Sequence, residues 1–290
     1  PRRNKTMKTL ITGAVGMLAR AAIRYCDSIG DTTIGLSRTE LDISDSAAVQ
    51  AAIKSLMPDI VLNCAAYTNV DGAESEIERC RAANVIGVEN LARECRNSGT
   101  VFVTVSTDYV FDGKRDGFYT EEDEPNPSGI YAVSKFDGEK AAQSVNEKAI
   151  IARSGWIFGC GGTNFLSVMH QFLGAGKPVT AICDSYGTPT YAEDLALRLR
   201  EMAEKDVSGV FHIANSGGGT SYLGFAQALC EIGGFDSGLL ESVSFHDLNR
   251  PAPRPLNSKL ASIRADEIGL APLPEWKNAI QRFLAAPLTG

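Results

Sequence analysis

The stretch Thr12-Gly13-Ala14-Val15-Gly16-Met17-Leu18-Ala19 decides the fold of this 290-residue chain. It follows an apolar run of strand length, residues 8–12, and opens a helical pattern over residues 17–28. Gly13 permits a tight turn, Gly16 lets the backbone approach a pyrophosphate, and the helix N-terminus offers free N–H groups. A Gly-x-x-Gly pair alone is a weak motif. Its position between the first strand and the first helix predicts a dinucleotide site.

Short apolar runs alternate with helical patterns around this turn, which predicts a Rossmann-type α/β fold with a doubly wound parallel sheet. The expected strands are 8–12, 32–36, 59–63, 101–106 and 149–152, and the expected helices are 17–28, 45–58, 75–97 and 128–145. The second half is looser, with helices expected at 165–173 and 192–205 and a strand at 210–213. We expect a dinucleotide-binding domain over 7–163, to which 191–216 returns, and a smaller C-terminal lobe, mainly 164–290, that binds the substrate.

Composition narrows the class of protein. The net charge of −7 argues against nucleic acid as a partner, although a helix N-terminus still binds a phosphorylated small ligand. The chain contains no run of 18 apolar residues, so no membrane span is predicted. Residues 1–6 lack the apolar segment of a secretory signal, so we expect the fold to begin at Met7. Seven cysteines without a Cys-x-x-Cys pair favour a reducing cytoplasm. The three histidines share no ligand spacing, so no metal is predicted.

The end of the second expected strand addresses the choice of cofactor. It reads Leu36-Ser37-Arg38, and an arginine there accommodates the 2′-phosphate of NADPH, whereas an acidic residue would favour NADH. We therefore expect NADPH, with NADH as an alternative. Arg38 also fits a solvated surface charge, and Asp42 fits either the adenine amino group or the cap of a turn.

The helix after the fourth strand carries Tyr131 and Lys135, which share one face at a spacing of four residues. Reduction of a ketone needs a proton, and a nearby ammonium lowers the pKa of a phenol, so the pair suits acid–base catalysis. The fourth strand ends in Ser106-Thr107, whose hydroxyls either orient a substrate oxygen or merely satisfy the strand end. The order of phosphate turn, strand-end hydroxyl and Tyr/Lys pair favours catalysis.

With these residues in hand, the chain resembles the dTDP-4-dehydrorhamnose reductase family of the extended short-chain dehydrogenase/reductase superfamily, from Met7 over nearly its whole length. The resemblance is carried by residues 63–74, 106–111, 153–159, 184–190 and 254–260. Two positions depart from the family pattern. Gly155 stands where serine usually precedes the tryptophan, and Met17 follows the second glycine of the turn where a polar residue is more common. Both leave the exact sugar open.

The resemblance implies three sets of site residues. The catalytic set is Thr107, Tyr131 and Lys135. The cofactor set is Gly13, Gly16, Met17, Leu18, Ser37, Arg38, Asp42, Ile43, Ala65, Ala66, Tyr67, Asn84, Ser106, Tyr131 and Lys135. The substrate set is Val70, Tyr109, Trp156 and Arg254, of which Arg254 also suits a diphosphate by its rigid fork, while Trp156 fits either stacking or core packing.

The implied function is NAD(P)H-dependent reduction of the 4-keto group of a nucleotide-linked 6-deoxysugar. The expected reaction takes dTDP-4-dehydro-L-rhamnose to dTDP-L-rhamnose with Tyr131 as proton donor, and the sequence leaves the oligomeric state open, with a homodimer as one option. A 4,6-dehydratase would carry Asp-Glu after the strand-four threonine, whereas Asp108 is followed here by Tyr109. An epimerase would not consume NADPH. The alternative from another class is an NADP-binding regulatory subunit resembling the β subunit of methionine adenosyltransferase.

Overall fold

The structure, a computed structural model, describes residues 6–286. The expectation that residues 1–6 stand outside the fold therefore concerns a segment of which 1–5 lie outside the described residues. No helix in the described part of the chain has the length and apolar character needed to cross a bilayer.

A six-stranded parallel sheet forms the centre, in the order β10-β5-β4-β3-β1-β2. Its strands are β1 (Lys8–Thr12), β2 (Thr32–Leu36), β3 (Ile60–Asn63), β4 (Val101–Thr107), β5 (Ile150–Ser154) and β10 (Gly209–His212). The order reverses between β1 and β3, so the sheet has its topological switch point there. The predicted doubly wound Rossmann-type sheet is confirmed.

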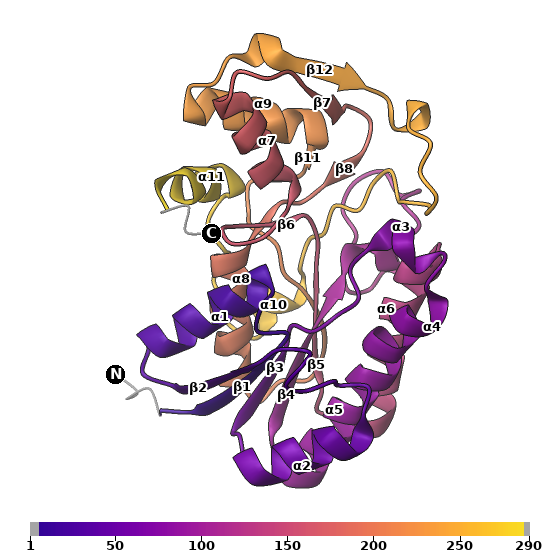
Figure 1. Cartoon of the computed structure of the whole chain (residues 1–290), viewed down its shortest axis with the longest axis vertical. Helices are drawn as coiled ribbons and strands as arrows, with labels where there is room; N and C mark the ends of the chain where they lie inside the picture. Colours follow the sequence, from indigo (N-terminus) through magenta and orange to yellow (C-terminus); the bar gives the residue numbers. More distant parts are fainter. Residues whose placement is uncertain (1–5, 287–290) are drawn as a thin grey trace.

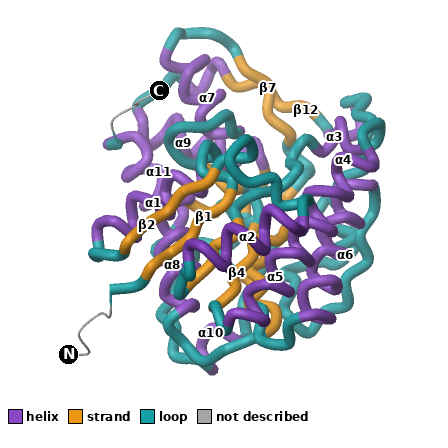
Figure 2. The backbone as a smooth tube through the Cα atoms, turned by 60° about the horizontal axis from the view of Figure 1, so that its bottom comes forward, coloured by secondary structure: helices purple, strands orange, loops and turns teal. Residues whose placement is uncertain are grey.

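Helices cover both faces of this sheet (Figures 1 and 2). One layer consists of α1 (Met17–Ser28) and α8 (Ala192–Ala203), which pack on each other over an apolar core that includes Ile11, Leu62 and Phe211. The other layer consists of α2 (Ser46–Leu56), α5 (Gly87–Ser98) and α6 (Ile130–Val145), over a core that includes Leu10, Val61 and Phe102. Neighbouring residues of one strand, such as Leu10 and Ile11, belong to the two different cores because both faces of the sheet are covered.

The single helix expected over residues 75–97 is wrong in detail. Residues 75–97 hold α4 (Ile77–Arg81), a π-helical turn over Ala82–Ile86 and most of α5, and a separate short helix, α3 (Val70–Ala73), precedes them. A Cβ on Gly138 of α6 would lie 2.0 Å from the carbonyl oxygen of Asn84, so the widened turn presses directly on α6. The apolar pattern predicts a helix here, but it does not reveal the extra residue of a π turn, because that residue depends on the tertiary contact with α6.

A lobe beyond the carboxyl ends of the strands has its own apolar core, which includes Leu166, Phe225 and Phe283 (Figure 1, top). Its helices are α7 (Phe165–Gly174), α9 (Tyr222–Gly233) and α11 (Trp276–Ala285), and β7 (Val179–Ile182) pairs with β12 (Leu240–Val243). Short strands complete it: β6 (Ile157–Phe158), β8 (Tyr186–Gly187), β9 (Thr190–Tyr191) and β11 (Thr220–Ser221). Helix α10 (Arg264–Glu267) instead lies against β10 of the main sheet.

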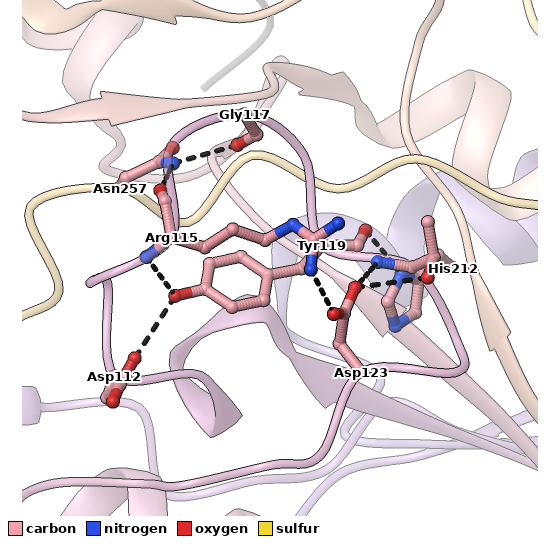
Figure 3. A network of polar contacts seen from close by, with 8 residues as sticks. Asp112, Arg115, Gly117, Tyr119, Asp123, His212 and Asn257 are labelled. Carbon is pink, nitrogen blue, oxygen red and sulfur yellow. Dashed lines mark hydrogen bonds and ion pairs between the residues drawn. The ribbon is translucent and has the colours of Figure 1, made fainter.

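The turn-rich loop between β4 and α6 is fixed by a polar network around Tyr119 (Figure 3). The Tyr119 hydroxyl donates to Asp112 at 3.1 Å, and its carbonyl oxygen lies 3.1 Å from Nδ1 of His212 on β10. Asn257 donates to the Gly117 carbonyl at 2.8 Å, which ties the loop to the C-terminal part of the chain. The loop that leads into α6, the helix of Tyr131, is therefore fixed at several points. His212, one of its partners, lies in the core.

Candidate active site

A cleft of about 800 Å³ lies at the carboxyl ends of the sheet strands, between the sheet and the lobe. Ligands of open α/β sheets bind at this edge, beside the switch point. The predicted site residues that line the cleft are Gly13, Gly16, Met17, Leu18, Arg38, Asp42, Ile43, Ala65, Ala66, Tyr67, Val70, Ser106, Thr107, Tyr109, Tyr131, Lys135 and Trp156. Three others, Ser37, Asn84 and Arg254, are not part of its wall. In residues 6–286 no group of three or more potential metal-binding side chains occurs.

The phosphate turn is shaped for an anion. Gly13 has a φ of +71°, and a Cβ there would lie 2.9 Å from backbone atoms of Ala65, so only glycine fits. Helix α1 begins after Gly16 without a side-chain cap, which leaves the N–H groups of its first turn available to a ligand. A turn closed against β3 with uncapped helical donors fits the pyrophosphate of a dinucleotide.

The turn after β2 is held by its own acidic residues. Glu40 accepts hydrogen bonds from the Ser37 N–H at 2.8 Å and from the Ser37 hydroxyl at 2.6 Å. Arg38 lies 3.5 Å from Asp42, and both side chains are largely exposed. Asp42 also accepts from the Ser44 N–H and hydroxyl, which lowers the pKa of its carboxyl. Asp42 thus caps a turn, and Ser37 faces Glu40 rather than the cleft.

The start of α6 presents the predicted pair to the cleft. Glu74 accepts a hydrogen bond from the Ile130 N–H at 2.8 Å, which caps the helix one residue before Tyr131. The Tyr131 ring meets Tyr109 edge-on with 6.0 Å between the ring centroids. Lys135 is buried, and its ammonium donates to the carbonyl oxygen of Val105 at 2.7 Å. Both side chains are therefore fixed at the end of β4.

Burial dominates the pKa values of the Tyr131 phenol and the Lys135 ammonium. Burial is the largest influence on Tyr131 and raises the pKa of its phenol well above the usual range, while the neighbouring Thr107 hydroxyl opposes the rise. Burial lowers the pKa of Lys135 to about 8. The lowering of the phenol pKa by Lys135 and a bound oxidised nicotinamide stays a prediction for the cofactor complex, and without that added charge burial decides the pKa of the phenol. Tyr131 accordingly keeps its proton at neutral pH and is set up to donate it.

Asp108 is a cleft residue that sequence reasoning missed. It is 2% exposed, and its Oδ1 accepts from the Thr107 hydroxyl at 3.1 Å while Oδ2 has no hydrogen-bond partner. Burial raises the pKa of this carboxyl to about 6, although the neighbouring Ser258 and Thr107 hydroxyls oppose the rise. A Cβ on Gly155 would lie 2.3 Å from the Asp108 carboxyl carbon, so the unusual glycine makes room for this carboxylate. A buried acceptor left open in a cleft points to a polar ligand.

Asn84 acts behind the cleft wall, from the π-helical turn. Its side chain accepts from the Tyr67 N–H at 2.8 Å and donates to the Tyr67 carbonyl at 3.1 Å and to the Ser134 hydroxyl at 3.0 Å. It thereby fixes the Tyr67 loop against α6. The glycine at position 138, in mid-helix, is the sequence signal for this close approach.

A second cavity of about 360 Å³ opens in the lobe and shares Tyr109 with the main cleft. Its wall is mostly apolar and aromatic, and two arginines lie on it, Arg250 and Arg254. Arg254 makes a bidentate pair with Asp71 of α3, with both N–O distances 2.8 Å. The predicted substrate residue Arg254 thus belongs to this second cavity, and Asp71 was missed because 183 residues separate the partners.

Trp156 lines the main cleft and packs on Tyr222, a residue of the second cavity. Its indole stacks on Tyr222 with 3.7 Å between ring centroids, and a Cβ on Gly187 would lie 2.2 Å from its Nε1. It has a φ of +48°, an unusual value for a large side chain. Trp156 therefore combines the two interpretations left open by the sequence, because it packs on Tyr222 and also lines the cleft.

Known proteins resemble this chain over nearly its whole length. The family model described as RmlD substrate binding domain matches residues 7–288. The chain is similar to dTDP-4-dehydrorhamnose reductase of Mycobacterium tuberculosis, with 38% identity that covers 98% of this chain and 94% of the relative. It is also similar to a probable dTDP-4,6-dihydroxy-2-methyloxan-3-one 4-ketoreductase of Streptomyces antibioticus, with 35% identity that covers 95% and 94%.

Among solved structures, dTDP-4-dehydrorhamnose reductase of Bacillus anthracis in complex with NADP matches with a TM-score of 0.93. The match has 29% sequence identity and covers 97% of this chain and 99% of the other. The sheet, the lobe and the cleft between them thus have a counterpart in a solved reductase.

Proposed function

This chain belongs to the dTDP-4-dehydrorhamnose reductase family, and we propose that it reduces the 4-keto group of dTDP-4-dehydro-L-rhamnose to give dTDP-L-rhamnose. The coarser statement, that it is an NAD(P)H-dependent reductase of a sugar nucleotide, follows from the family. The observation that supports the finer proposal is that Tyr131, Lys135 and Thr107 line one cleft, which shares Tyr109 with the arginine-bearing cavity of the lobe.

The nicotinamide cofactor would occupy the part of the cleft that begins at the phosphate turn. The uncapped first turn of α1 would bind its pyrophosphate, and Arg38 would face a 2′-phosphate. NADPH, with NADH as the alternative, supplies the hydride when bound. The Bacillus anthracis relative in complex with NADP supports this assignment.

The residues of this chain supply the rest of the chemistry. Thr107 would turn its hydroxyl proton from Asp108 to the keto oxygen and so orient it, and Tyr131 transfers its phenolic proton to that oxygen as negative charge develops. The Lys135 ammonium then stabilises the phenolate that remains. The raised pKa of Tyr131 supports this role, because the phenol stays protonated until substrate arrives.

The sugar nucleotide would span both cavities. Asp108 and Tyr109 would face the sugar, with Val70 and Trp156 on the wall, while the lobe cavity would hold the nucleotide. Arg250, and the Arg254 N–H groups that the pair with Asp71 leaves free, suit its diphosphate, and aromatic side chains such as Phe165 and Phe245 suit a base. The cofactor would thus bind to the domain that contains the sheet, and the nucleotide of the substrate would bind to the lobe.

The test is oxidation of NADPH, followed by absorbance, with enzymatically generated dTDP-4-dehydro-L-rhamnose as substrate and NADH in parallel. We expect rapid oxidation and dTDP-L-rhamnose as the product by NMR. Oxidation with a different product would transfer the proposal to another 4-keto-6-deoxysugar, as the Streptomyces antibioticus relative illustrates. Tight NADPH binding without oxidation would favour the regulatory-subunit alternative.

The cellular setting and assembly stay proposals. All seven cysteines are free, which supports a reducing compartment such as the cytoplasm. A homodimer is one option that the sequence leaves open, and sedimentation analysis of the purified chain tests it.

A further inference from the structure

A buried ion pair joins the proposed catalytic helix, α6, to strand β5. Glu139 of α6 is 3% exposed and Arg153 of β5 is 4% exposed. The guanidinium grips the carboxylate with Nε–Oε1 at 3.0 Å and Nη2–Oε2 at 2.7 Å. A buried pair of this kind adds little net stability over apolar packing, so its presence beside a reactive site calls for another reason.

Glu139 has a third partner, and that partner belongs to the cleft. The Ser106 hydroxyl donates to Oε1 of Glu139, and Ser106 lines the cleft beside Thr107. One helical turn earlier, Lys135 donates to the carbonyl oxygen of Val105. Successive turns of α6 therefore hold successive residues of β4, immediately before the threonine that would orient the keto oxygen.

The charge around Lys135 comes mainly from Glu139. The titratable side chains that act on the ammonium are Glu139 on the same helix, Cys80 on α4 and Cys64 after β3. Burial raises the pKa of both thiols, that of Cys64 to about 12, so both are neutral in the physiological range. Arg153 pairs with Glu139, with 2.7 Å between Nη2 and Oε2, and offsets part of its charge. Glu139 is thus the carboxylate that favours the charged form of Lys135 against the cost of burial.

We propose that Glu139 is a positioning residue for the reaction, which fixes the end of β4 through Ser106 and keeps the buried Lys135 charged. This inference rests on the proposed function of the same site. It assigns to the Glu139–Arg153 pair a role in the reaction that a purely structural ion pair would not have.

The experiment compares Glu139→Gln with Asp31→Asn. Asp31 and Arg200 form a second buried bidentate pair, at the amino end of the sheet, with Nε–Oδ2 at 2.5 Å and Nη2–Oδ1 at 2.9 Å. Both variants remove one buried negative charge and keep a hydrogen-bonding amide, but only one lies beside Lys135. Two readouts are followed against pH, namely kcat for the sugar nucleotide and the Kd for NADPH by fluorescence.

In the wild type we expect kcat to fall as Lys135 loses its proton, above about pH 8. In Glu139→Gln this fall, and the weakening of NADPH binding that accompanies it, should move to lower pH by roughly 0.5–1 unit. In Asp31→Asn neither curve should move. The double variant Glu139→Gln/Arg153→Gln keeps a neutral amide pair if the single variant folds poorly, and should show a smaller shift in the same direction.

Unshifted curves in a folded Glu139 variant would overturn the inference, as would an equal shift in Asp31→Asn. Failure of the proposed function looks different. Wild-type protein that binds NADPH and turns over no sugar nucleotide would refute the reaction, and the pH dependence of the Kd for NADPH would still decide the role of Glu139.

Discussion

Two buried carboxylates, Asp31 at the amino end of the central sheet and Asp108 at its carboxyl end, differ in how completely they are hydrogen-bonded. At the amino end, Asp31 has both oxygens engaged, by the Arg200 guanidinium, the Met7 N–H and the Thr9 hydroxyl. At the carboxyl end, Asp108 has one oxygen bonded to Thr107 and the other without a partner. Ser154 nearby also has an unpartnered buried hydroxyl.

The difference separates stability from function within one sheet. Satisfied polar groups stabilise a fold, because burial of an unsatisfied group costs free energy. Polar groups without a partner at a cleft wall retain this free-energy cost until a ligand forms a hydrogen bond with them. We therefore expect substitutions at the amino end to change the free energy of unfolding, and substitutions at the carboxyl end to change catalysis.

The largest expected effect is that of Tyr131→Phe. Loss of the phenolic proton should lower kcat by roughly 10²–10⁴-fold, the usual contribution of a general acid. NADPH affinity should change less than about threefold, since the ring and its edge-on contact with Tyr109 stay. The measurement is steady-state kinetics with a parallel fluorescence titration of NADPH.

The matched control is Tyr25→Phe on α1, which removes a phenolic hydroxyl from the helical layer near Arg200. Its kcat should equal that of the wild type. A Tyr131 variant that keeps most of its activity, or that loses NADPH binding in proportion to kcat, would remove Tyr131 from the role of proton donor.

The amino end is tested by Asp31→Asn. Arg200 is fully buried, so removal of its partner's charge should lower the free energy of unfolding by about 3–5 kcal/mol. The contacts that Asp31 makes lower the pKa of its carboxyl, so its stabilisation is complete above its unfolded pKa and is lost as pH falls through the lower folded value. Urea unfolding at about pH 7 and at about pH 3 measures both effects. A large loss of kcat per folded molecule would contradict this expectation, because it would show that the amino end also affects catalysis.

What sequence could predict follows the range of the interactions. The phosphate turn and the pair Tyr131/Lys135 are local patterns, and the structure places them in one cleft. The partners that complete the site are distant in sequence. Asp71 binds Arg254 across 183 residues, and the open carboxylate of Asp108 depends on Gly155. No local period records such pairings.

Asp108→Asn should combine a gain with a loss. Burial raises the pKa of Asp108 to about 6, above its unfolded value, so the folded protein loses stability as pH rises through that range. The neutral amide avoids this cost and should stabilise the protein by about 1–3 kcal/mol above about pH 7. The advantage should vanish near about pH 4, where the wild-type carboxyl is protonated. Thermal unfolding at the two pH values measures the difference.

The same variant should lower kcat/KM for the sugar nucleotide by roughly tenfold, because a charged acceptor facing the sugar is lost. A stabilised variant with unchanged kcat/KM would mean that the open oxygen of Asp108 serves no ligand. The contrast between the two ends of the sheet would then rest on Tyr131 and Lys135 alone.

The smallest expected effect concerns Glu40, a carboxylate at the carboxyl edge that is satisfied like Asp31. It accepts from the N–H and hydroxyl of Ser37, donors that a 2′-phosphate beside Arg38 would also use. NADPH must therefore displace Glu40, whereas NADH need not. Glu40→Gln should improve the preference for NADPH over NADH by roughly threefold, measured as the ratio of the two kcat/KM values. Glu122→Gln, an exposed change of the same charge, should leave the ratio unchanged. An equal change in both variants would attribute the effect to net charge, and Glu40 would then have no part in choosing the cofactor.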